Sequence, residues 1–390
     1  MKWTMRSLAC AAALAIAPAA QALDLRIVPA GGVIVNQANA RGWSDAVVAG
    51  VVIAAGPREA VEVRALRIEL LRDEAVRETR VIGADALVEA SVGLAGAGFP
   101  EAIAAQVLNR EGLAGLFGRA MVLGSDASLS PNAALVAPPQ YFAFTGEIDS
   151  VRVVLDYEMR GRARTQSAEA PARRHETPLR YTAPVRGLWT QQATPTLQSH
   201  HRLNASTEFA ADFFRMNERG EIYGGDPLDP ESAFGYGEPV YAAADGVVVH
   251  VVADETQDRA AMMRRADETP QQAGQRIGRY MMERLARDFR RAAGGNLIVI
   301  RHEADGVVEY SSYGHLRAGS VRVREGQSVR QGEEIAEVGD TGDSPAVHLH
   351  FQLNAGPDPF TSPSLPVRFT DLRPAAGNNE LGRVVVAGPE

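Results

Sequence analysis

The sequence predicts a mainly β protein of two domains: a β-sandwich-like accessory domain, then a compact antiparallel β domain with a helical insertion. Three observations support this prediction. Short apolar segments with a period of two residues recur along the chain. Many of the 37 glycines and 22 prolines separate these segments, as turn residues do. One long segment of helical pattern interrupts the second half, and 390 residues exceed the roughly 100–150 of a common single domain.

Residues 1–22 have the pattern of a secretory signal peptide. Lys2 and Arg6 precede an apolar run that closes on small residues, which predicts cleavage before Leu23 and a secreted, periplasmic protein. The single cysteine, Cys10, lies inside this run, so the mature chain would hold neither a disulfide nor a thiolate metal site. No later run of roughly 18 apolar residues occurs, so we expect no transmembrane segment in the mature chain.

Residues 23–185 form the predicted accessory domain. The segments "LRIEL" (66–70) and "VRVVLDY" (151–157) alternate apolar and polar side chains, which is typical of half-buried strands. A helical excursion is predicted to begin at Pro100, because proline is favoured in the first turn of a helix. These features favour a β-sandwich-like domain.

The second half is predicted to hold a linker (186–204), an antiparallel β domain (205–365) and a loose C-terminal tail (366–390). In the β domain, strand-like runs alternate with glycine-containing turns, as in "PVYAAADGVVVHV" and "GGNLIVIRHE". The tail is rich in Gly, Pro and Asn, which are typical of loops.

A helical insertion is predicted over residues 254–295. Ile277, Met281, Leu285 and Phe289 recur every four residues between charged side chains, as on one face of a helix. Two hypotheses fit this pattern: a surface decoration with one packed face, or a lid or docking element for a partner.

The charge of the chain argues against one class of partner. The formal net charge is −8, and acidic and basic residues are mixed along the sequence. Nucleic-acid-binding domains instead concentrate positive charge on one face. We therefore expect no nucleic-acid partner.

Two histidines lie two residues apart in the run "PAVHLHFQL". Residues i and i+2 of a strand point to the same face, so His348 and His350 would share one site. Imidazole is a frequent zinc ligand. A pair of hydrogen-bonded histidines with no metal is the alternative explanation for this motif alone.

Further segments carry a family resemblance. "FAADFF" with Asp212, "PVYAAADGVV", "GNLIVIRH", "YGHL" with His315 and "TGDSPAVHLHF" follow one another in this order between about residues 209 and 353. In that order they resemble the lysostaphin-type (LytM-type) zinc endopeptidases, which cut peptidoglycan peptides. The resemblance implies a peptidase-like β domain, and the N-terminal half lies outside it.

The resemblance also implies roles for individual residues. Asp212 and His350 match zinc ligands, and His315 and His348 match the two histidines that activate water and stabilise the transition state. One zinc ion per chain is implied. A zinc ion with three protein ligands keeps one position open for water, lowers the pKa of that water and polarises the scissile carbonyl.

One ligand position departs from the family pattern. The residue four before Asp212 should be histidine, and it is Glu208. Glu208 could itself be the third ligand, although residues four apart in an extended strand are roughly 13 Å apart. Alternatively, His200 or His201 could supply the third ligand. A third possibility is an incomplete site in a domain that binds without cutting.

Two further candidates and two functions follow. Tyr313 and Asn296 could lie near the site, or they could serve the hydrophobic core and the sheet.

The first function that the sequence supports is a secreted zinc metalloendopeptidase that acts on peptidoglycan peptides through zinc-activated water. The alternative is a catalytically degenerate relative that binds cell-wall peptide or regulates another wall hydrolase. The four matching residues favour the enzyme, and Glu208 favours the binder.

Overall fold

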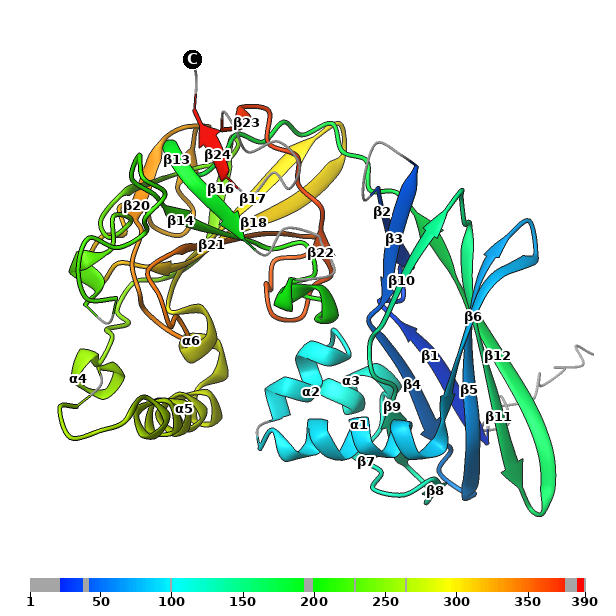
Figure 1. Cartoon of the computed structure of the whole chain (residues 1–390). Coiled ribbons are helices and arrows are strands. Elements are labelled where there is room, and N and C mark those ends of the chain that lie inside the picture. Colours follow the sequence, from blue (N-terminus) through cyan, green and yellow to red (C-terminus); the bar gives the residue numbers. More distant parts are fainter. Residues whose placement is uncertain are drawn as a thin grey trace, which may run out of the picture.

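The structure is a computed structural model. It describes residues 22–37, 42–98, 100–192, 199–227, 229–263, 265–375 and 384–388. Apart from Ala22, the predicted signal peptide lies outside these ranges. The described chain is mainly β and forms two units, with the accessory domain and the peptidase-like domain side by side (Figure 1). The predicted fold class is confirmed.

The accessory domain is a sandwich of two sheets. The four-stranded sheet has the order β1 (Leu23–Val28), β4 (Gly50–Ala55), β9 (Ala133–Val136) and β7 (Val122–Leu123). The eight-stranded sheet has the order β10 (Gln140–Thr145), β3 (Trp43–Val48), β2 (Val33–Gln37), β12 (Arg162–Arg173), β11 (Ser150–Met159), β5 (Val61–Arg72) and β6 (Ala75–Gly83), and β8 (Ser128–Leu129) pairs with β5.

The core of this sandwich follows from the period of its strands. On β5, Leu66, Ile68 and Leu70 are fully buried, and the residues between them are partly exposed. They share one hydrophobic cluster with Ile53 and Leu135 of the four-stranded sheet. Alternate side chains of both sheets therefore meet in one core, as the sequence predicts.

Three helices cover the outer face of the four-stranded sheet (Figure 1). They are α1 (Ala84–Gly96), α2 (Pro100–Gln106) and α3 (Gly112–Phe117). The helix predicted at Pro100 is α2. Helices α1 and α3 are not predicted, because their short, alanine- and glycine-rich sequences carry little helical periodicity. In α1, only Leu87 and Ser91 are buried.

The peptidase-like domain is built on a ten-stranded sheet. Its order is β19 (Ser328–Val329), β16 (Gly246–Val252), β17 (Asn296–Ala304), β18 (Val307–Leu316), β21 (Leu349–Asn354), β14 (Ala211–Arg215), β13 (Gly187–Gln192), β24 (Val384–Ala387) and β23 (Leu372–Pro374), and β22 (Ser364–Leu365) pairs with β21. A small sheet of β15 (Pro239–Tyr241) and β20 (Glu334–Glu337) shares its hydrophobic core.

Two segments predicted as irregular contain strands of this sheet. Strand β13 begins within the predicted linker, and β23 and β24 lie within the predicted tail. Gly187–Thr190 pairs with Val384–Ala387 in antiparallel register, so β24 lies beside β13. These strands are short and depend on tertiary pairing, which explains why local composition indicated loops.

The predicted insertion joins β16 to β17 and contains three helices, α4 (Arg259–Met262), α5 (Pro270–Arg287) and α6 (Phe289–Gly294). Thr269 and Gln272 form a capping box at the start of α5. Met281 of the predicted apolar face is buried. Across the described ranges, every helix is too short or too polar to span a membrane.

Candidate metal centre

The centre of the site is a pair of residues on neighbouring strands. Asp212 of β14 lies directly opposite His350 of β21 in antiparallel register. The flanking Phe213, Leu349 and Phe351 are fully buried in the hydrophobic core on the other face. Strand alternation therefore turns Asp212 and His350 to the same side, and His350 Nδ1 lies 3.0 Å from Asp212 Oδ1.

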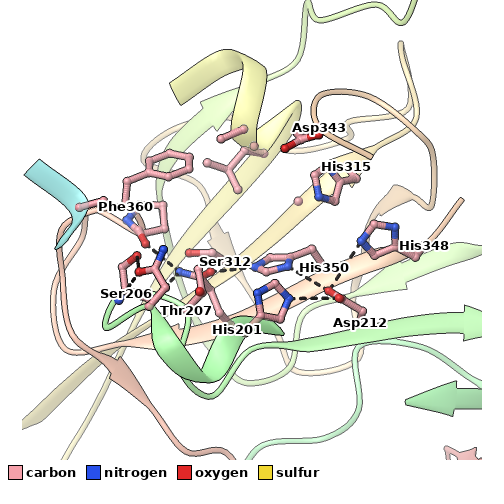
Figure 2. A pocket seen from close by; sticks show the side chains of 18 of the residues that line it. His201, Ser206, Thr207, Asp212, Ser312, His315, Asp343, His348, His350 and Phe360 are labelled. Carbon is pink, nitrogen blue, oxygen red and sulfur yellow. Dashed lines mark hydrogen bonds and ion pairs between the residues drawn. The ribbon is translucent and has the colours of Figure 1, made fainter. Parts of the chain in front are cut away.

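A third donor comes from the 3₁₀ helix η1 (His200–Leu203), which precedes β14. His201 Nε2 lies 3.1 Å from Asp212 Oδ2. The side chain of Ser199 caps η1 by accepting a hydrogen bond from the His201 backbone N–H. Potential ligand atoms of His201, Asp212 and His350 all lie within 4.8 Å of one another. Figure 2 shows His201, His348 and His350 grouped around the carboxylate of Asp212.

These three donors fit a zinc ion. Ligand atoms about 2.0–2.2 Å from a tetrahedral zinc ion lie roughly 3.3–3.5 Å from one another. The contacts of 3.0 and 3.1 Å, which are made to the two different oxygens of Asp212, are close to this spacing, and one ligand atom from each residue lies within 4.8 Å of the others. Two imidazoles and one carboxylate are also a ligand set that zinc accepts in catalytic sites.

Glu208 lies apart from this cluster. It sits in a run of turns before β14, so its side chain does not follow the strand's alternation. The Glu208 carboxylate binds the guanidinium of Arg202, which also binds Asp45 of the accessory domain. Burial raises the pKa of Glu208 to about 8, although Arg202 opposes the shift. The structure thus brings His201, not Glu208, to Asp212; the side chain of His200 is not among those described.

His348 and His315 lie beside the three donors. His348 Nε2 is 3.6 Å from Asp212 Oδ1, and its Nδ1 is 2.8 Å from the Ala346 carbonyl oxygen. His315 Nδ1 is 2.8 Å from the Thr341 carbonyl oxygen. Because a carbonyl oxygen only accepts, the Nδ1 atoms of both histidines carry a proton. The Phe214 ring stacks on His348 at a centroid distance of 5.0 Å.

The backbone of His315 is unusual. Its φ angle is +60°, in the left-handed region that non-glycine residues rarely adopt. His315 is near the end of β18, after Gly314, which pairs with His350. The left-handed conformation accompanies the placement of the imidazole among the other histidines, with ring centroids 4.8 Å from His348 and 5.8 Å from His350.

The environment separates the protonation states of these groups. Burial alone would raise the pKa of Asp212, but hydrogen bonds from His201 and His350 outweigh it and hold the pKa well below its usual value. Burial and the neighbouring His348 and His350 hold the pKa of His315 well below its usual value. Asp212 is therefore an anion and His315 a neutral base near neutral pH.

Gln352 is a site residue that the sequence analysis does not identify. It follows His350 by two residues on the same face of β21, and its Oε1 lies 2.8 Å from His350 Nε2. Burial lowers the pKa of His350, but hydrogen bonds to Asp212 and Gln352 outweigh it and raise the pKa. An acceptor at Nε2 leaves Nδ1 free to bind a cation in place of a proton. In the segment "HLHFQ", Gln352 follows His348 and His350 at the same two-residue spacing, and this pattern could have identified Gln352 from the sequence.

Two other predicted candidates serve the scaffold. Tyr313 is fully buried on the far face of β18, where its hydroxyl accepts a hydrogen bond from the Ala243 N–H at 2.8 Å. Asn296 is also buried, and its side-chain amide bonds Leu316 and Glu255. It therefore ties the start of the helical insertion to the sheet.

The histidines open into a cavity of about 360 Å³. Its remaining walls are largely apolar and come from several segments. They include Phe214, Phe289, Ala293, Leu297, Pro345, Pro359 and Phe360, with Ala105 from helix α2 of the accessory domain. Helix α6 of the insertion thus forms part of the wall. Its volume lies in the range of about 300–1,000 Å³ that is usual for ligand-binding pockets.

Sequence comparison connects this site to a family. The profile of peptidase family M23 matches residues 284–361. Cell division protein DipM of Caulobacter vibrioides is 41% identical over 63 residues, which are 16% of this chain and 10% of that protein. Lipoprotein NlpD of Yersinia enterocolitica is 31% identical over 117 residues, which are 30% of this chain and 77% of that protein.

A solved structure shows a more distant likeness. The catalytic domain of lysostaphin from Staphylococcus simulans is 22% identical, with a TM-score of 0.24, over 45% of this chain and 88% of that one. The Yersinia relative is matched over most of its length, and the family profile falls on the sheet that carries His315, His348 and His350. The chain belongs to peptidase family M23.

Proposed function

We propose that the protein is a secreted, periplasmic zinc metalloendopeptidase that cleaves peptide bonds of peptidoglycan. The observation that carries this proposal is the convergence of His201, Asp212 and His350 at one wall of a peptide-sized cavity. The predicted signal peptide and the resemblance to wall peptidases support the location and substrate. A cell-wall enzyme partner at residues 254–295 remains a prediction.

In this proposal His201, Asp212 and His350 hold one zinc ion. When bound, zinc supplies a Lewis acid that polarises the scissile carbonyl and lowers the pKa of water. The anionic Asp212 offsets part of the metal's charge, and Gln352 fixes the ring of His350.

His348 and His315 move protons. Each holds its Nδ1 proton against a backbone carbonyl, so its Nε2 can take a proton from attacking water. The same atom can then donate that proton to the leaving amine. The apolar walls formed by Phe289 and Phe360 exclude water from part of the cavity, which strengthens these interactions.

The first experiment is a zinc measurement on purified protein that begins at Leu23. We expect about one zinc per chain, retained in a His250→Ala control because His250 is an exposed partner of Glu325. His350→Ala should lose the metal. Zinc-loaded protein should then release new amino termini from peptidoglycan, and a chelator should stop the release.

Two outcomes would contradict the proposal at different levels. Absence of zinc in every variant after incubation with excess metal would refute the metallopeptidase function. Stoichiometric zinc without cleavage of peptidoglycan from any of several chemotypes would leave a metal-binding wall protein that does not cut.

A further inference from the structure

The segment that carries His201 is held by both domains. Ala205 packs with Val47 of strand β3 and with Ala49, which follows β3 in the accessory domain, against Tyr141 of β10. On the other side, the Ser206 carbonyl accepts hydrogen bonds from Gln352 at 3.2 Å and Asn354 at 2.9 Å. The segment therefore lies between the accessory domain and the peptidase sheet.

A buried ion cluster connects this segment to the accessory domain. The side chain of Arg202 is fully buried. One guanidinium nitrogen donates to Asp45 of β3, and another donates to Glu208. Asp45 also accepts a hydrogen bond from Asn36 of β2 at 3.2 Å. One cation thus joins two strands of the accessory domain to the turn that leads into β14.

Such a cluster specifies one geometry more than it adds stability. Desolvation of a buried guanidinium and its two carboxyl partners offsets much of the energy of their contacts. The planar fork of arginine nevertheless accepts its partners only in defined directions. The rings of Phe209 and Tyr141 lie 5.0 and 5.8 Å from the guanidinium carbon and further limit its movement.

Arg202 follows His201 directly in η1. Successive side chains of a 3₁₀ helix point about 120° apart, so a fixed Arg202 also fixes the direction of His201. The Arg202 guanidinium points to Asp45 and Glu208, and the His201 imidazole points to Asp212. Asp45 and Glu208 themselves lie outside the group of donors.

We propose that Arg202, anchored by Asp45 of the accessory domain and by Glu208, is a positioning residue that holds His201 at the metal centre. This rests on the proposed function, because it assumes that His201 is a zinc ligand. The accessory domain then completes the metal site without supplying a ligand. It also gives Glu208 a role at a position where the family resemblance implies a histidine.

The test is a double-mutant cycle read as zinc affinity. The full mature protein, Asp45→Asn, His201→Ala and the double variant would each compete for zinc with a chromophoric chelator. Asp24→Asn is the matched control, because Asp24 pairs with Arg119 inside the accessory domain, at 3.1 Å. Circular dichroism would establish that each variant is folded. If Asp45→Asn is not folded, Arg202→Lys replaces it, since lysine cannot reproduce the two-pronged contact.

The expected results separate positioning from a structural role. Asp45→Asn should weaken zinc binding about tenfold, within the 10–100-fold range of outer-shell changes. His201→Ala should weaken it at least about 100-fold, and adding Asp45→Asn to His201→Ala should cause no further loss. Asp24→Asn should bind zinc like the unmodified protein.

Three results would overturn the proposal. A loss of thermal stability in Asp45→Asn with unchanged zinc affinity would make the cluster structural and leave the proposed function intact. If Asp45→Asn lowered zinc affinity equally in the unmodified protein and in His201→Ala, Asp45 would act by a route that does not involve His201. An unchanged affinity in His201→Ala would remove the ligand assignment on which both proposals rest.

Discussion

Two buried carboxylates lie four residues apart in this chain, and their surroundings give them opposite properties. Asp212 faces three imidazoles at the edge of a cavity, and its pKa is held well below the usual value. Glu208 is closed in with a guanidinium and a second carboxylate, and its pKa is raised to about 8. Asp212 has the environment of a metal ligand, whereas Glu208 already has a cation as its partner. The comparison teaches that a carboxyl group that already contacts a cation of the protein is not available to a metal ion. This matters more than residue type or spacing in the sequence.

The largest expected effect would separate these two carboxylates directly. Asp212→Asn should lower zinc affinity at least about 100-fold, because an amide is a weaker ligand and lacks the compensating charge. Glu208→Gln should lower it by no more than about tenfold, through altered positioning of His201. Isothermal titration with zinc would measure both. Equal losses of zinc affinity in the two variants would show that Glu208 is itself a metal ligand, and Asp212 and Glu208 would then not differ in function.

A second prediction concerns the imidazoles around Asp212. His348→Gln should keep zinc bound but reduce kcat by about 10²–10⁴-fold, as expected for loss of a general acid–base group. His350→Gln should lose the metal instead. Metal content measured beside single-turnover cleavage would distinguish them. Loss of zinc from His348→Gln would place His348 among the ligands and contradict the proton-transfer role proposed for it.

The smallest expected effect is on stability. The folded-state pKa of Glu208, about 8, lies above its usual 4.5, so between these values the folded protein binds more protons than the unfolded chain. The stabilising contribution is therefore complete below about pH 4.5 and is lost as pH rises through about 8. A single proton changes the unfolding free energy by about 1.4 kcal/mol per pH unit within this window. Glu208→Gln should flatten this fall in unfolding free energy.

Denaturant unfolding between pH 5 and 8.5, with a chelator present, would measure this effect. Asp212 should behave in the opposite sense, because its lowered pKa gives stability that is present above about pH 4 and lost as pH falls further. An unchanged slope in Glu208→Gln would mean that Glu208 is ionised throughout this pH range.

Much of the site could be predicted from local sequence. His348 and His350 are two residues apart on one strand, so period alone places them together. Asp212 and His315 lie on other strands, and only their resemblance to a known order of motifs connected them. The sandwich could be predicted because Leu66, Ile68 and Leu70 of β5 are buried and alternate with half-buried residues.

From the sequence, the third metal ligand could be narrowed to Glu208, His200 or His201, but no choice among them was possible. Whether His201 or Glu208 reaches Asp212 depends on turns at 205–209 and on a partner, Asp45, that is 157 residues from Arg202. A contact of that separation leaves no local pattern. Strands β13 and β24 are not predicted for the same reason, since they pair with each other from opposite ends of the domain.

Under the proposed function, the left-handed backbone of His315 sets catalytic activity against the stability of the folded protein. An imidazole in this conformation costs on the order of 1–3 kcal/mol relative to a relaxed backbone. Glycine or asparagine would adopt the same φ with less strain and so make the folded protein more robust, but would remove the proton acceptor. A search for heat-resistant variants would therefore favour loss of His315, and a screen that scores only folding would select inactive protein.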